Sequence, residues 1–378
     1  MSRFLNRRVR GLEPYVPGEQ PREGTFIKLN TNENPYPPSP RVIEAIREAA
    51  GEGLRRYPDP ECRVLREAVA GVYGVQPEQV FAGNGSDEVL AFAFGAFFPS
   101  APASGEGSLA GSGGPVIFPD VTYSFYPVYA GLWEIPYRTV PVGEDFSVNA
   151  EDYLVPAGGV VLANPNAPTG RALPLREILS VAGYQGKAGR VLIVDEAYGA
   201  FGAETAAAHI GEYPNLLTVH TLSKAASLAG LRVGFAIGSQ ELIQGLCRIR
   251  DSFNSYTLDR LALAGGTAAV LDTAYYAGIT ARIIATRERV SGRLGELGFE
   301  VVPSSANFIF IRHPARSGAA IFAALRERGI LVRHFDKPRI RDHLRVSIGT
   351  DEEMDAFLQA AQEAAWEAVR EAAGGPGQ

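Results

Sequence analysis

Lysine is scarce in this chain of 378 residues. Only four of its 36 basic residues are lysines, namely Lys28, Lys187, Lys224 and Lys337, and the other 32 are arginines. A guanidinium group does not lose its proton in proteins, so it cannot act as a base or attack a carbonyl carbon. A general bias towards arginine explains the scarcity, but chemistry that needs a side-chain amine is confined to these four positions.

Other absences exclude whole classes of protein. The longest hydrophobic run, Val89–Phe98, is well short of the roughly 18 residues that a membrane span needs. Acidic residues outnumber basic ones by 42 to 36, which argues against a general nucleic-acid binder. Cys62 and Cys247 are too few for a disulfide framework and lack metal-ligand spacing, and Met1–Arg10 has no apolar stretch after it. We therefore expect a cytoplasmic protein without a metal, bound neither to a membrane nor to nucleic acid.

The central part of the chain reads as alternating strands and helices. Short apolar runs predict strands at Val116–Phe118, Gly159–Ala163, Val191–Val194 and Leu216–Val219, and Leu175–Gly183 is helix-like. Such a pattern is typical of a mostly parallel sheet that is covered by helices on both faces, an α/β fold. Ligands bind at the carboxyl ends of the strands in these sheets, so the residues after each run are the candidates for a site.

The last hundred residues have a different pattern, which predicts a smaller α+β domain. Strands are expected at Asn307–Arg312, Ile330–Val332 and Leu344–Ile348, and an amphipathic helix is expected at Gly318–Arg328. Thr350–Glu353 has the form of a capping box and opens a helix that continues to Ala373. The expected domains are therefore an N-terminal arm at 1–29, a large domain at 30–270 and a small domain at 271–378.

Lys224 follows the strand Leu216–Val219, at the edge of the sheet where ligands bind. Thr221, Ser223 and Arg232 are close to it in sequence, and hydroxyls with a guanidinium group make an anion site. A lysine beside positive charge and partly removed from water has a lowered pKa and can form a Schiff base. A solvated lysine on a polar loop is the alternative.

Asp195 comes directly after another buried run, at the start of the sequence DEAY that ends at Tyr198. A carboxylate at the end of a buried strand is costly unless a cation or a protonated nitrogen pairs with it. An ordinary helix cap is the alternative. Tyr198 points the same way if a helical turn begins here.

Three more segments follow strands or open helices. Gly83–Glu88 precedes an apolar helix, where Ser86 is a candidate cap and free backbone amides bind phosphate. Asn164–Gly170 forces a tight turn, with an asparagine near the strand ends. Tyr123 is either a core residue or a platform for a flat ligand. Arg345 lies in an otherwise apolar strand, which suggests a pocket that holds an anion.

These residues together indicate a single ligand. It has an aldehyde that reacts with Lys224, a basic ring nitrogen that pairs with Asp195, a flat ring that lies against Tyr123, and a phosphate that Ser86, Ser223 and Arg232 bind. Pyridoxal 5'-phosphate has all four features, and it needs a Schiff-base lysine with an acidic partner for the pyridine nitrogen.

The chain resembles the pyridoxal-phosphate aminotransferases of the aspartate aminotransferase fold, and among these it is most similar to the histidinol-phosphate aminotransferases. The resemblance extends from Leu12 to the final helix. Its motifs are LNTNENPYP (Leu29–Pro37), RRYPDP (Arg55–Pro60), GNGSDE, NPNAPTG, DEAY and TLSKAASLAGLRVGF (Thr221–Phe235). It implies a mixed, mostly parallel sheet in the large domain and an N-terminal arm that contacts the small domain or a partner subunit.

The resemblance also implies roles for individual residues. Lys224 binds the cofactor aldehyde and moves a proton between the α-carbon of the substrate and C4′ of the cofactor. Asp195 pairs with the ring nitrogen, Tyr198 bonds to the ring hydroxyl and Tyr123 stacks on the ring. The cofactor phosphate is bound by Ser86, Asp87, Ser223 and Arg232, and Tyr57 of a partner subunit reaches the same phosphate. The substrate is bound by Arg345, Arg333 and a partner's Tyr15. The implied assembly is a homodimer with shared sites.

Two features depart from the family pattern. The family has an asparagine directly before Pro-Thr-Gly, where this chain has Ala167, so we expect Asn166 to replace it or Tyr198 to make the ring contact alone. The segment 99–115, rich in Gly, Ser, Ala and Pro, is longer than usual and is expected to be a surface loop without an assigned function.

The predicted reaction is transamination of L-histidinol phosphate with 2-oxoglutarate, which gives imidazole acetol phosphate and L-glutamate in histidine biosynthesis. Three alternatives stay open: an aromatic amino acid aminotransferase, a threonine-phosphate decarboxylase, and a regulator without enzymatic activity. The regulator would need a fused DNA-binding domain, and only about 30 residues precede LNTNENPYP.

Overall fold

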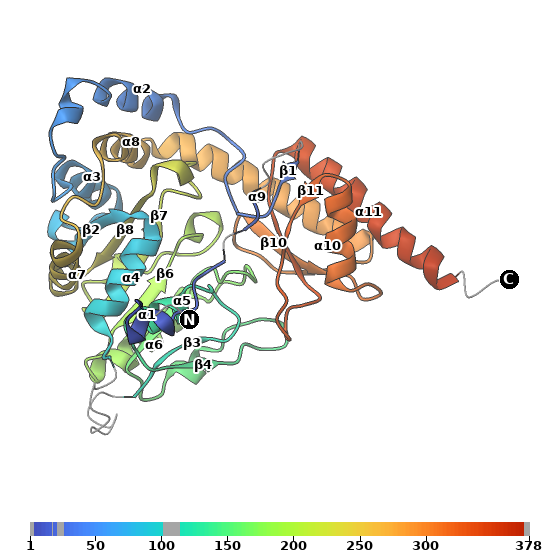
Figure 1. The fold of residues 1–378 in the computed structure, drawn as a ribbon, viewed down its shortest axis with the longest axis horizontal. Helices are drawn as coiled ribbons and strands as arrows, with labels where there is room; N and C mark the ends of the chain where they lie inside the picture. Colours follow the sequence, from blue (N-terminus) through green and yellow to red (C-terminus); the bar gives the residue numbers. More distant parts are fainter. Residues whose placement is uncertain (1–3, 17, 21–25, 101–113, 374–378) are drawn as a thin grey trace.

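The computed structural model describes residues 4–16, 18–20, 26–100 and 114–373 and arranges them as a large unit and a smaller one (Figure 1). The large unit is built on a seven-stranded sheet. Its strands, in spatial order, are β2 (Val80–Asn84), β8 (Val233–Gly238), β7 (Leu216–Thr221), β6 (Leu192–Asp195), β5 (Gly159–Ala163), β3 (Val116–Pro119) and β4 (Tyr137–Val140). Only β8 runs antiparallel to its neighbours in this sheet. The predicted α/β class with a mostly parallel, mixed sheet is confirmed.

Helices cover both faces of this sheet because successive side chains of a strand point to opposite sides. On β6, Leu192 and Val194 join one buried cluster and Ile193 joins the other. The helices of the first cluster are α2 (Pro40–Ala49), α3 (Arg63–Tyr73), α6 (Leu175–Lys187) and α8 (Arg260–Leu271). Those of the second are α4 (Gly85–Phe97), α5 (Tyr126–Leu132) and α7 (Gln240–Phe253). This covering explains why the central strands read as continuous apolar runs.

The smaller unit has an antiparallel sheet of four strands. In spatial order they are β12 (Arg333–His334), β13 (Leu344–Ser347), β10 (Phe308–Arg312) and β9 (Glu300–Val302). Three helices accompany it: α9 (Thr273–Glu296), α10 (Gly318–Glu327) and α11 (Asp351–Ala373). In Figure 1, α9 runs from the large unit across to the smaller one.

The N-terminal segment joins the two units. After the short helix α1 (Arg7–Arg10), strand β1 (Ile27–Lys28) pairs in parallel with β11 (Ile330–Leu331). Leu29 then packs into the buried cluster of the smaller unit. The residues after Leu29 are therefore attached to the smaller unit where they turn towards the large sheet.

Several local predictions are confirmed and others need adjustment. Thr350 and Glu353 form the expected capping box, since each backbone amide donates to the other side chain. Ser86 is not the cap of α4: Asn84 holds that position and Ser86 lies in the first turn. Strand β8 was not predicted, and most of 99–115 lies outside the described residues.

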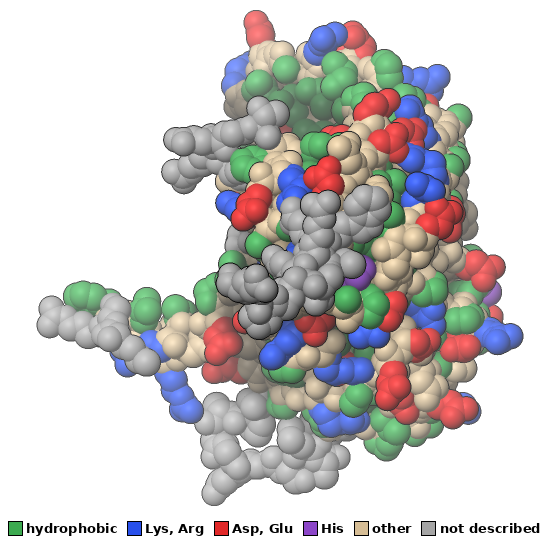
Figure 2. Space-filling model, turned by 90° about the vertical axis from the view of Figure 1, so that its right-hand side faces the viewer, with side chains coloured by type: hydrophobic (Ala, Val, Ile, Leu, Met, Phe, Trp, Pro, Cys, Tyr) green, Lys and Arg blue, Asp and Glu red, His purple; other side chains and the backbone are tan. Residues whose placement is uncertain are grey.

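The surface mixes charges of both signs. On the face shown in Figure 2, Lys and Arg side chains are interspersed with Asp and Glu. Arg289 of α9, for example, pairs with Asp351 and Asp355 of α11 at 3.2 and 2.5 Å. Within the described ranges, no helix is long and apolar enough to cross a membrane.

Candidate active site

One pocket collects most of the predicted site residues. It lies at the carboxyl ends of β6 and β7, where the N-terminal segment and the strands β12 and β13 meet the large sheet. Eleven of the thirteen predicted residues line it: Tyr15, Ser86, Asp87, Tyr123, Asp195, Tyr198, Ser223, Lys224, Arg232, Arg333 and Arg345. Asn166 and Tyr57 do not.

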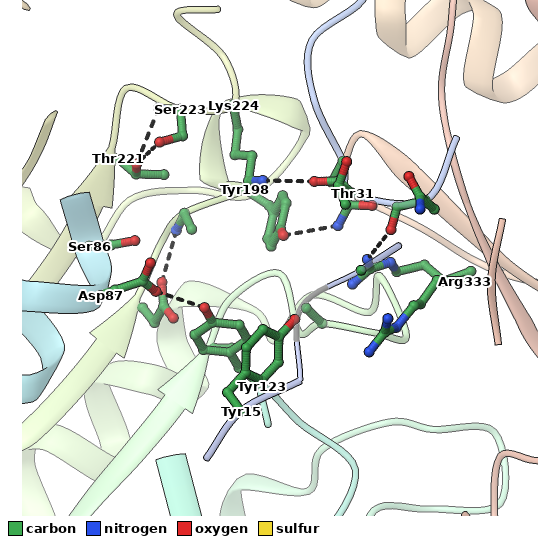
Figure 3. A pocket seen from close by; sticks show the side chains of 18 of the residues that line it. Tyr15, Thr31, Ser86, Asp87, Tyr123, Tyr198, Thr221, Ser223, Lys224 and Arg333 are labelled. Carbon is green, nitrogen blue, oxygen red and sulfur yellow. Dashed lines mark hydrogen bonds between the residues drawn. The ribbon is translucent and has the colours of Figure 1, made fainter. Parts of the chain in front are cut away.

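Lys224 reaches into the pocket from the loop that follows β7. Its Nζ donates a hydrogen bond of 3.1 Å to the carbonyl oxygen of Thr31 (Figure 3). Burial, reinforced by the positive charges of Arg345 and Arg232, lowers the pKa of this amine to about 8. The neutral form of the amine, which a nucleophile or a base requires, is therefore far more populated near physiological pH than for an ordinary lysine.

Asp195, the last residue of β6, is a buried carboxylate whose hydrogen-bond donors are neutral. The Tyr126 hydroxyl donates to one of its oxygens at 2.9 Å, and the amide of Ala197 donates to the other at 3.1 Å. Burial raises the pKa of this carboxyl to about 6. A protonated ring nitrogen would supply the positive charge that the carboxylate lacks, so the residue fits a pyridinium ligand.

A cradle for an anion lies at the start of α4. Gly85 has φ +77°, and a Cβ there would lie 2.6 Å from Nη2 of Arg232. A Cβ on Gly234 would lie 2.4 Å from the backbone nitrogen of Ser86, so two glycines keep this part of the pocket open. Backbone amides at the first turn of a helix together with a guanidinium group form a phosphate site.

Asp87 ties the two sides of this cradle together. Its carboxylate pairs with Arg232 at 2.9 Å and accepts a hydrogen bond of 2.7 Å from the Tyr123 hydroxyl (Figure 3). The Tyr123 ring is thereby held in the pocket beside the position that a flat ligand over Asp195 would occupy. Ser223 also lines this side, and its Oγ accepts a hydrogen bond from Thr221.

Two arginines lie directly opposite each other on the far side of the pocket. Arg333 of β12 and Arg345 of β13 are cross-strand partners, an arrangement of like charges that destabilises a sheet unless an anion compensates it. Arg345 donates to the carbonyl oxygen of Asn30 at 2.9 Å, and its Nε is buried without a partner. Burial lowers the pKa of this guanidinium group. These features fit a site for an anionic substrate.

Asn166 is not among the residues that line the pocket. Its amide nitrogen donates to Val121 and Thr169, and its amide oxygen accepts from Thr122 at 2.8 Å. Asn166 therefore anchors the turn to residues 121 and 122, while Ala167 lines the pocket. The replacement of the family residue by Asn166 stays a prediction.

The two aromatic residues expected from a partner subunit behave differently. Tyr15 lines the pocket of its own chain and stacks on Phe125, the residue before α5, with ring centroids 4.3 Å apart. A contribution of the partner's Tyr15 stays a prediction. Tyr57 lies away from the pocket, 78% exposed and stacked on Tyr256.

Sequence reasoning missed the contribution of Thr31 and Asn32, which also line the pocket. The Asn32 amide donates a hydrogen bond of 2.9 Å to the Tyr198 hydroxyl. Both residues belong to the motif LNTNENPYP, and that motif was the sequence feature that could have identified them. Its pattern does not indicate which groups their side chains contact. Within the described ranges, no cluster of His, Cys, Asp or Glu could hold a metal ion.

Comparisons with known proteins agree with this geometry. Residues 24–360 match the family model of aminotransferase class I and II. A histidinol-phosphate aminotransferase of Burkholderia pseudomallei is 54% identical over 96% of this chain and 99% of its own. Another, from Clostridium acetobutylicum, is 52% identical over 96% and 99%.

Solved structures show the same fold. The crystal structure of histidinol-phosphate aminotransferase from Sinorhizobium meliloti in complex with pyridoxal-5'-phosphate superposes with a TM-score of 0.85, 26% identity, and coverage of 97% of this chain and 99% of that one. Aspartate aminotransferase from Thermus thermophilus with maleate gives 0.80 at 21% identity, covering 96% of this chain and 100% of that one, which is a likeness of fold.

Proposed function

We propose that this chain, which belongs to the class I and II aminotransferases, transfers the amino group of L-histidinol phosphate to 2-oxoglutarate with pyridoxal 5'-phosphate as cofactor. The products are imidazole acetol phosphate and L-glutamate, in histidine biosynthesis. The observation on which this rests most is the buried Lys224 amine, which lies in one pocket with Asp195 and with the facing pair Arg333 and Arg345. The identity of 52–54% to histidinol-phosphate aminotransferases over nearly the whole chain supports the choice of substrate.

The residues of the pocket fit the cofactor part by part. When bound, pyridoxal phosphate withdraws electrons from the α-carbon of an amino substrate and so makes its hydrogen acidic. Asp195 would hold the ring nitrogen in its protonated form, and Tyr123 would lie against the ring. The amides at Ser86 and Asp87, with Ser223 and Arg232, would bind the phosphate.

Lys224 would act as the base and the acid of the reaction. Its neutral amine would take the α-proton of the substrate, and the resulting ammonium group would give the proton back. The low pKa of about 8, caused first by burial, leaves a neutral amine available for the first transfer. Tyr198 would donate a hydrogen bond to the ring oxygen from the opposite side of the pocket.

Arg333 and Arg345 would bind the charged end of each substrate in turn. Histidinol phosphate has a phosphate group and 2-oxoglutarate has two carboxylates, and both kinds of anion accept paired hydrogen bonds from guanidinium groups. The same arginine pair therefore serves the donor and the acceptor in the two halves of the reaction.

A donor screen tests the proposed reaction. The purified protein, loaded with pyridoxal phosphate, is assayed with 2-oxoglutarate and either histidinol phosphate, phenylalanine or threonine phosphate, and glutamate is measured. We expect kcat/KM to be highest for histidinol phosphate. A preference for phenylalanine would favour an aromatic aminotransferase, and release of carbon dioxide from threonine phosphate would overturn transamination.

The enzyme would act as a homodimer in which Tyr57 reaches the cofactor phosphate of the partner subunit. The exposure of this tyrosine and its distance from the pocket of its own chain support that role. Mixed dimers test it: Tyr57→Ala and Lys224→Ala subunits are inactive or weak alone, but a dimer of one each contains one intact site. Recovery of activity on mixing is expected, and absence of recovery in a proven mixed dimer would refute sharing.

Two further expectations belong to this proposal. The described Cys62 and Cys247 are free thiols, which suits an enzyme of the cytoplasm whose partners are small molecules. The boundaries 1–29, 30–270 and 271–378 would separate the arm, the large domain and the small domain. Limited proteolysis that releases a stable fragment ending near residue 270 would support the second boundary.

A further inference from the structure

Asn32 is a buried asparagine that connects the arm, the smaller unit and the pocket. It is 1% exposed and has φ +55°, a left-handed conformation that few side chains adopt and that asparagine tolerates. Its amide nitrogen lies 2.9 Å from the hydroxyl oxygen of Tyr198. In Figure 3 this contact is the dashed line at the Tyr198 hydroxyl, on the side of the pocket towards Thr31.

The orientation of the Asn32 amide is determined by Ser347. The backbone nitrogen of Asn32 donates to the Ser347 hydroxyl at 2.8 Å, and that hydroxyl donates to Oδ1 of Asn32 at 3.0 Å. The backbone carbonyl of Asn32 accepts from Asn307 at 3.1 Å. Because the side-chain oxygen faces Ser347, the NH2 group must face Tyr198. An NH2 group only donates, so the tyrosine oxygen accepts this bond.

We propose that Asn32 is a positioning residue for Tyr198: it occupies an acceptor lone pair of the hydroxyl, so that the phenolic proton points into the pocket towards the bound ligand. This inference rests on the proposed function, because it assigns the direction of the hydrogen bond to the cofactor ring. It also gives Tyr198 a support from outside DEAY, the motif in which it lies.

Among the described residues, the neighbouring turn supplies no hydrogen bond to the Tyr198 hydroxyl, whereas Asn32 does. Ala167, which also lines the pocket, has no polar side-chain group, and the Asn166 amide is hydrogen-bonded to Val121 and Thr122. Burial raises the pKa of Tyr198, so the phenol keeps its proton, although the positive charge of Arg345 and the hydrogen bond from Asn32 oppose that rise in part. A protonated hydroxyl with its acceptor side occupied is a donor to whatever lies in front of it.

The same contacts link Tyr198 to the substrate arginine. Ser347 lies two residues after Arg345 on β13, on the same face of the strand. A displacement of β13 when Arg345 binds an anion would move Ser347 and therefore the Asn32 amide. Asn32 thus connects the strand that binds the substrate with the tyrosine that contacts the cofactor.

A double-mutant cycle tests the inference by spectroscopy. Asn32→Gly removes the amide and still accepts the positive φ. The pH titration of the visible absorption band of bound pyridoxal phosphate is recorded for wild type, Asn32→Gly, Tyr198→Phe and the double variant. A donor near the ring oxygen favours the deprotonated form of the lysine adduct, so losing its alignment raises the titration midpoint.

We expect Asn32→Gly to raise the midpoint by about 0.5 pH unit or more, roughly a threefold change in proton affinity. In the Tyr198→Phe background, the same change should have almost no effect. An equal shift in both backgrounds, or no shift in the wild-type background, would overturn the inference.

Two more variants sharpen the result. Asn32→Asp keeps the size and the left-handed conformation but accepts the tyrosine proton, so it should raise the midpoint further than Asn32→Gly. Asn215→Ala removes another asparagine, which does not line the pocket and whose side-chain amide donates to the carbonyls of Ala182 and Arg190, and should leave the midpoint unchanged. Failure of one Asn32 variant to fold leaves the other as a test.

The outcome separates this inference from the function on which it rests. If the wild-type protein forms no absorption band with pyridoxal phosphate, the proposed function fails and the inference fails with it. If the band forms and titrates but Asn32→Gly and Asn32→Asp leave its midpoint in place, only the role of Asn32 is refuted.

Discussion

The side of the pocket proposed for the cofactor and the side proposed for the substrate differ in how their charged groups are paired. On the cofactor side, Arg232 is paired with Asp87, and Asp195 accepts two hydrogen bonds from neutral donors. On the substrate side, Arg333 and Arg345 face each other across a strand pair. The first side is largely organised before any ligand arrives. The second side brings two guanidinium groups together, to which an anionic substrate could bind, so changes on the two sides should have separable effects.

The largest effect is expected from removing the amine of Lys224. Lys224→Ala should eliminate the visible cofactor band and reduce turnover by roughly a thousandfold or more, since acid–base catalysis alone contributes about 10²–10⁴-fold. Lys224→Arg should also fail, because a guanidinium group stays protonated. Absorption spectra and single-turnover rates measure both effects.

Lys187→Ala, at the end of α6, is the matched control and should behave as wild type. Turnover that persists in Lys224→Ala would contradict the assignment of the site. The comparison between the two lysines then shows whether the reactive amine is identified by its place in the pocket or only by the small number of lysines in the chain.

The second effect concerns the buried carboxylate of the cofactor side. Asp195→Asn keeps the shape, and its amide can donate to Tyr126 while its oxygen accepts from Ala197. It no longer keeps the ring nitrogen protonated, so kcat should fall by roughly 10²–10³-fold, as for loss of one electrostatic contact in a transition state. Steady-state rates with histidinol phosphate measure this loss.

The same variant should be more stable without cofactor. Burial raises the pKa of Asp195 from 3.8 to about 6, so between these pH values the folded protein holds a proton that the unfolded chain has released. Stability of the wild type therefore falls as pH rises through this window, and the deficit is complete above it. We expect Asp195→Asn to unfold at higher temperature than wild type at pH 7.5, with the difference shrinking towards pH 4. A variant that is less stable at every pH would contradict this account.

The third effect belongs to the substrate side alone. Arg345→Gln removes a charged hydrogen-bond donor, which contributes about 1.5–3 kcal/mol, so kcat/KM should fall by roughly 10- to 100-fold for donor and acceptor. The cofactor band should remain. Stability should not fall, because the repulsion between Arg345 and Arg333 is relieved. Arg312→Gln on the exposed end of β10, where the native arginine pairs with Glu300 at 2.6 Å, is the control for charge alone.

Loss of the cofactor band in Arg345→Gln would erase the distinction between the two sides. So would an unchanged KM for both substrates, which would place the anion site elsewhere. Band intensity and KM together therefore decide whether the pocket has two separable halves.

The cofactor side could be predicted from the sequence because each of its residues follows a recognisable strand. Asp195 ends β6 and Lys224 follows β7, and the carboxyl ends of parallel strands lie at one edge of a sheet. The aldehyde, the ring nitrogen and the phosphate could be inferred from these positions. The sheet order and the antiparallel β8 could not, because neither leaves a local pattern.

The substrate side depends on segments that are far apart in the chain. Asn32 contacts Ser347 across more than 300 positions, and its amide donates to Tyr198, which lies 166 positions away in the chain. Such contacts arise from tertiary packing and have no periodicity to read. The contacts of Asn166 could not be predicted for a related reason, because Val121 and Thr122 are more than 40 positions away from it in the chain.

The smallest effect is expected at the boundary between the two sides. Ala167 is 4% exposed, lines the pocket and packs with Ala306 and Phe308. Ala167→Asn adds an amide that would crowd these neighbours, at a cost of about 1 kcal/mol in stability. The Tyr198 hydroxyl already has its donor in Asn32, so the new amide is not needed and kcat/KM should stay within roughly tenfold of wild type.

Cofactor titration, kcat/KM and thermal unfolding of Ala167→Asn measure these expectations. Complete loss of cofactor binding would mean that the turn at 164–170 approaches the ring more closely than Ala167 allows. A gain in activity would show that an amide at this position adds a ring contact that Asn32 and Tyr198 do not supply. Retained activity with a modest loss of stability would instead show that Tyr198, held by Asn32, makes the ring contact without an amide at position 167.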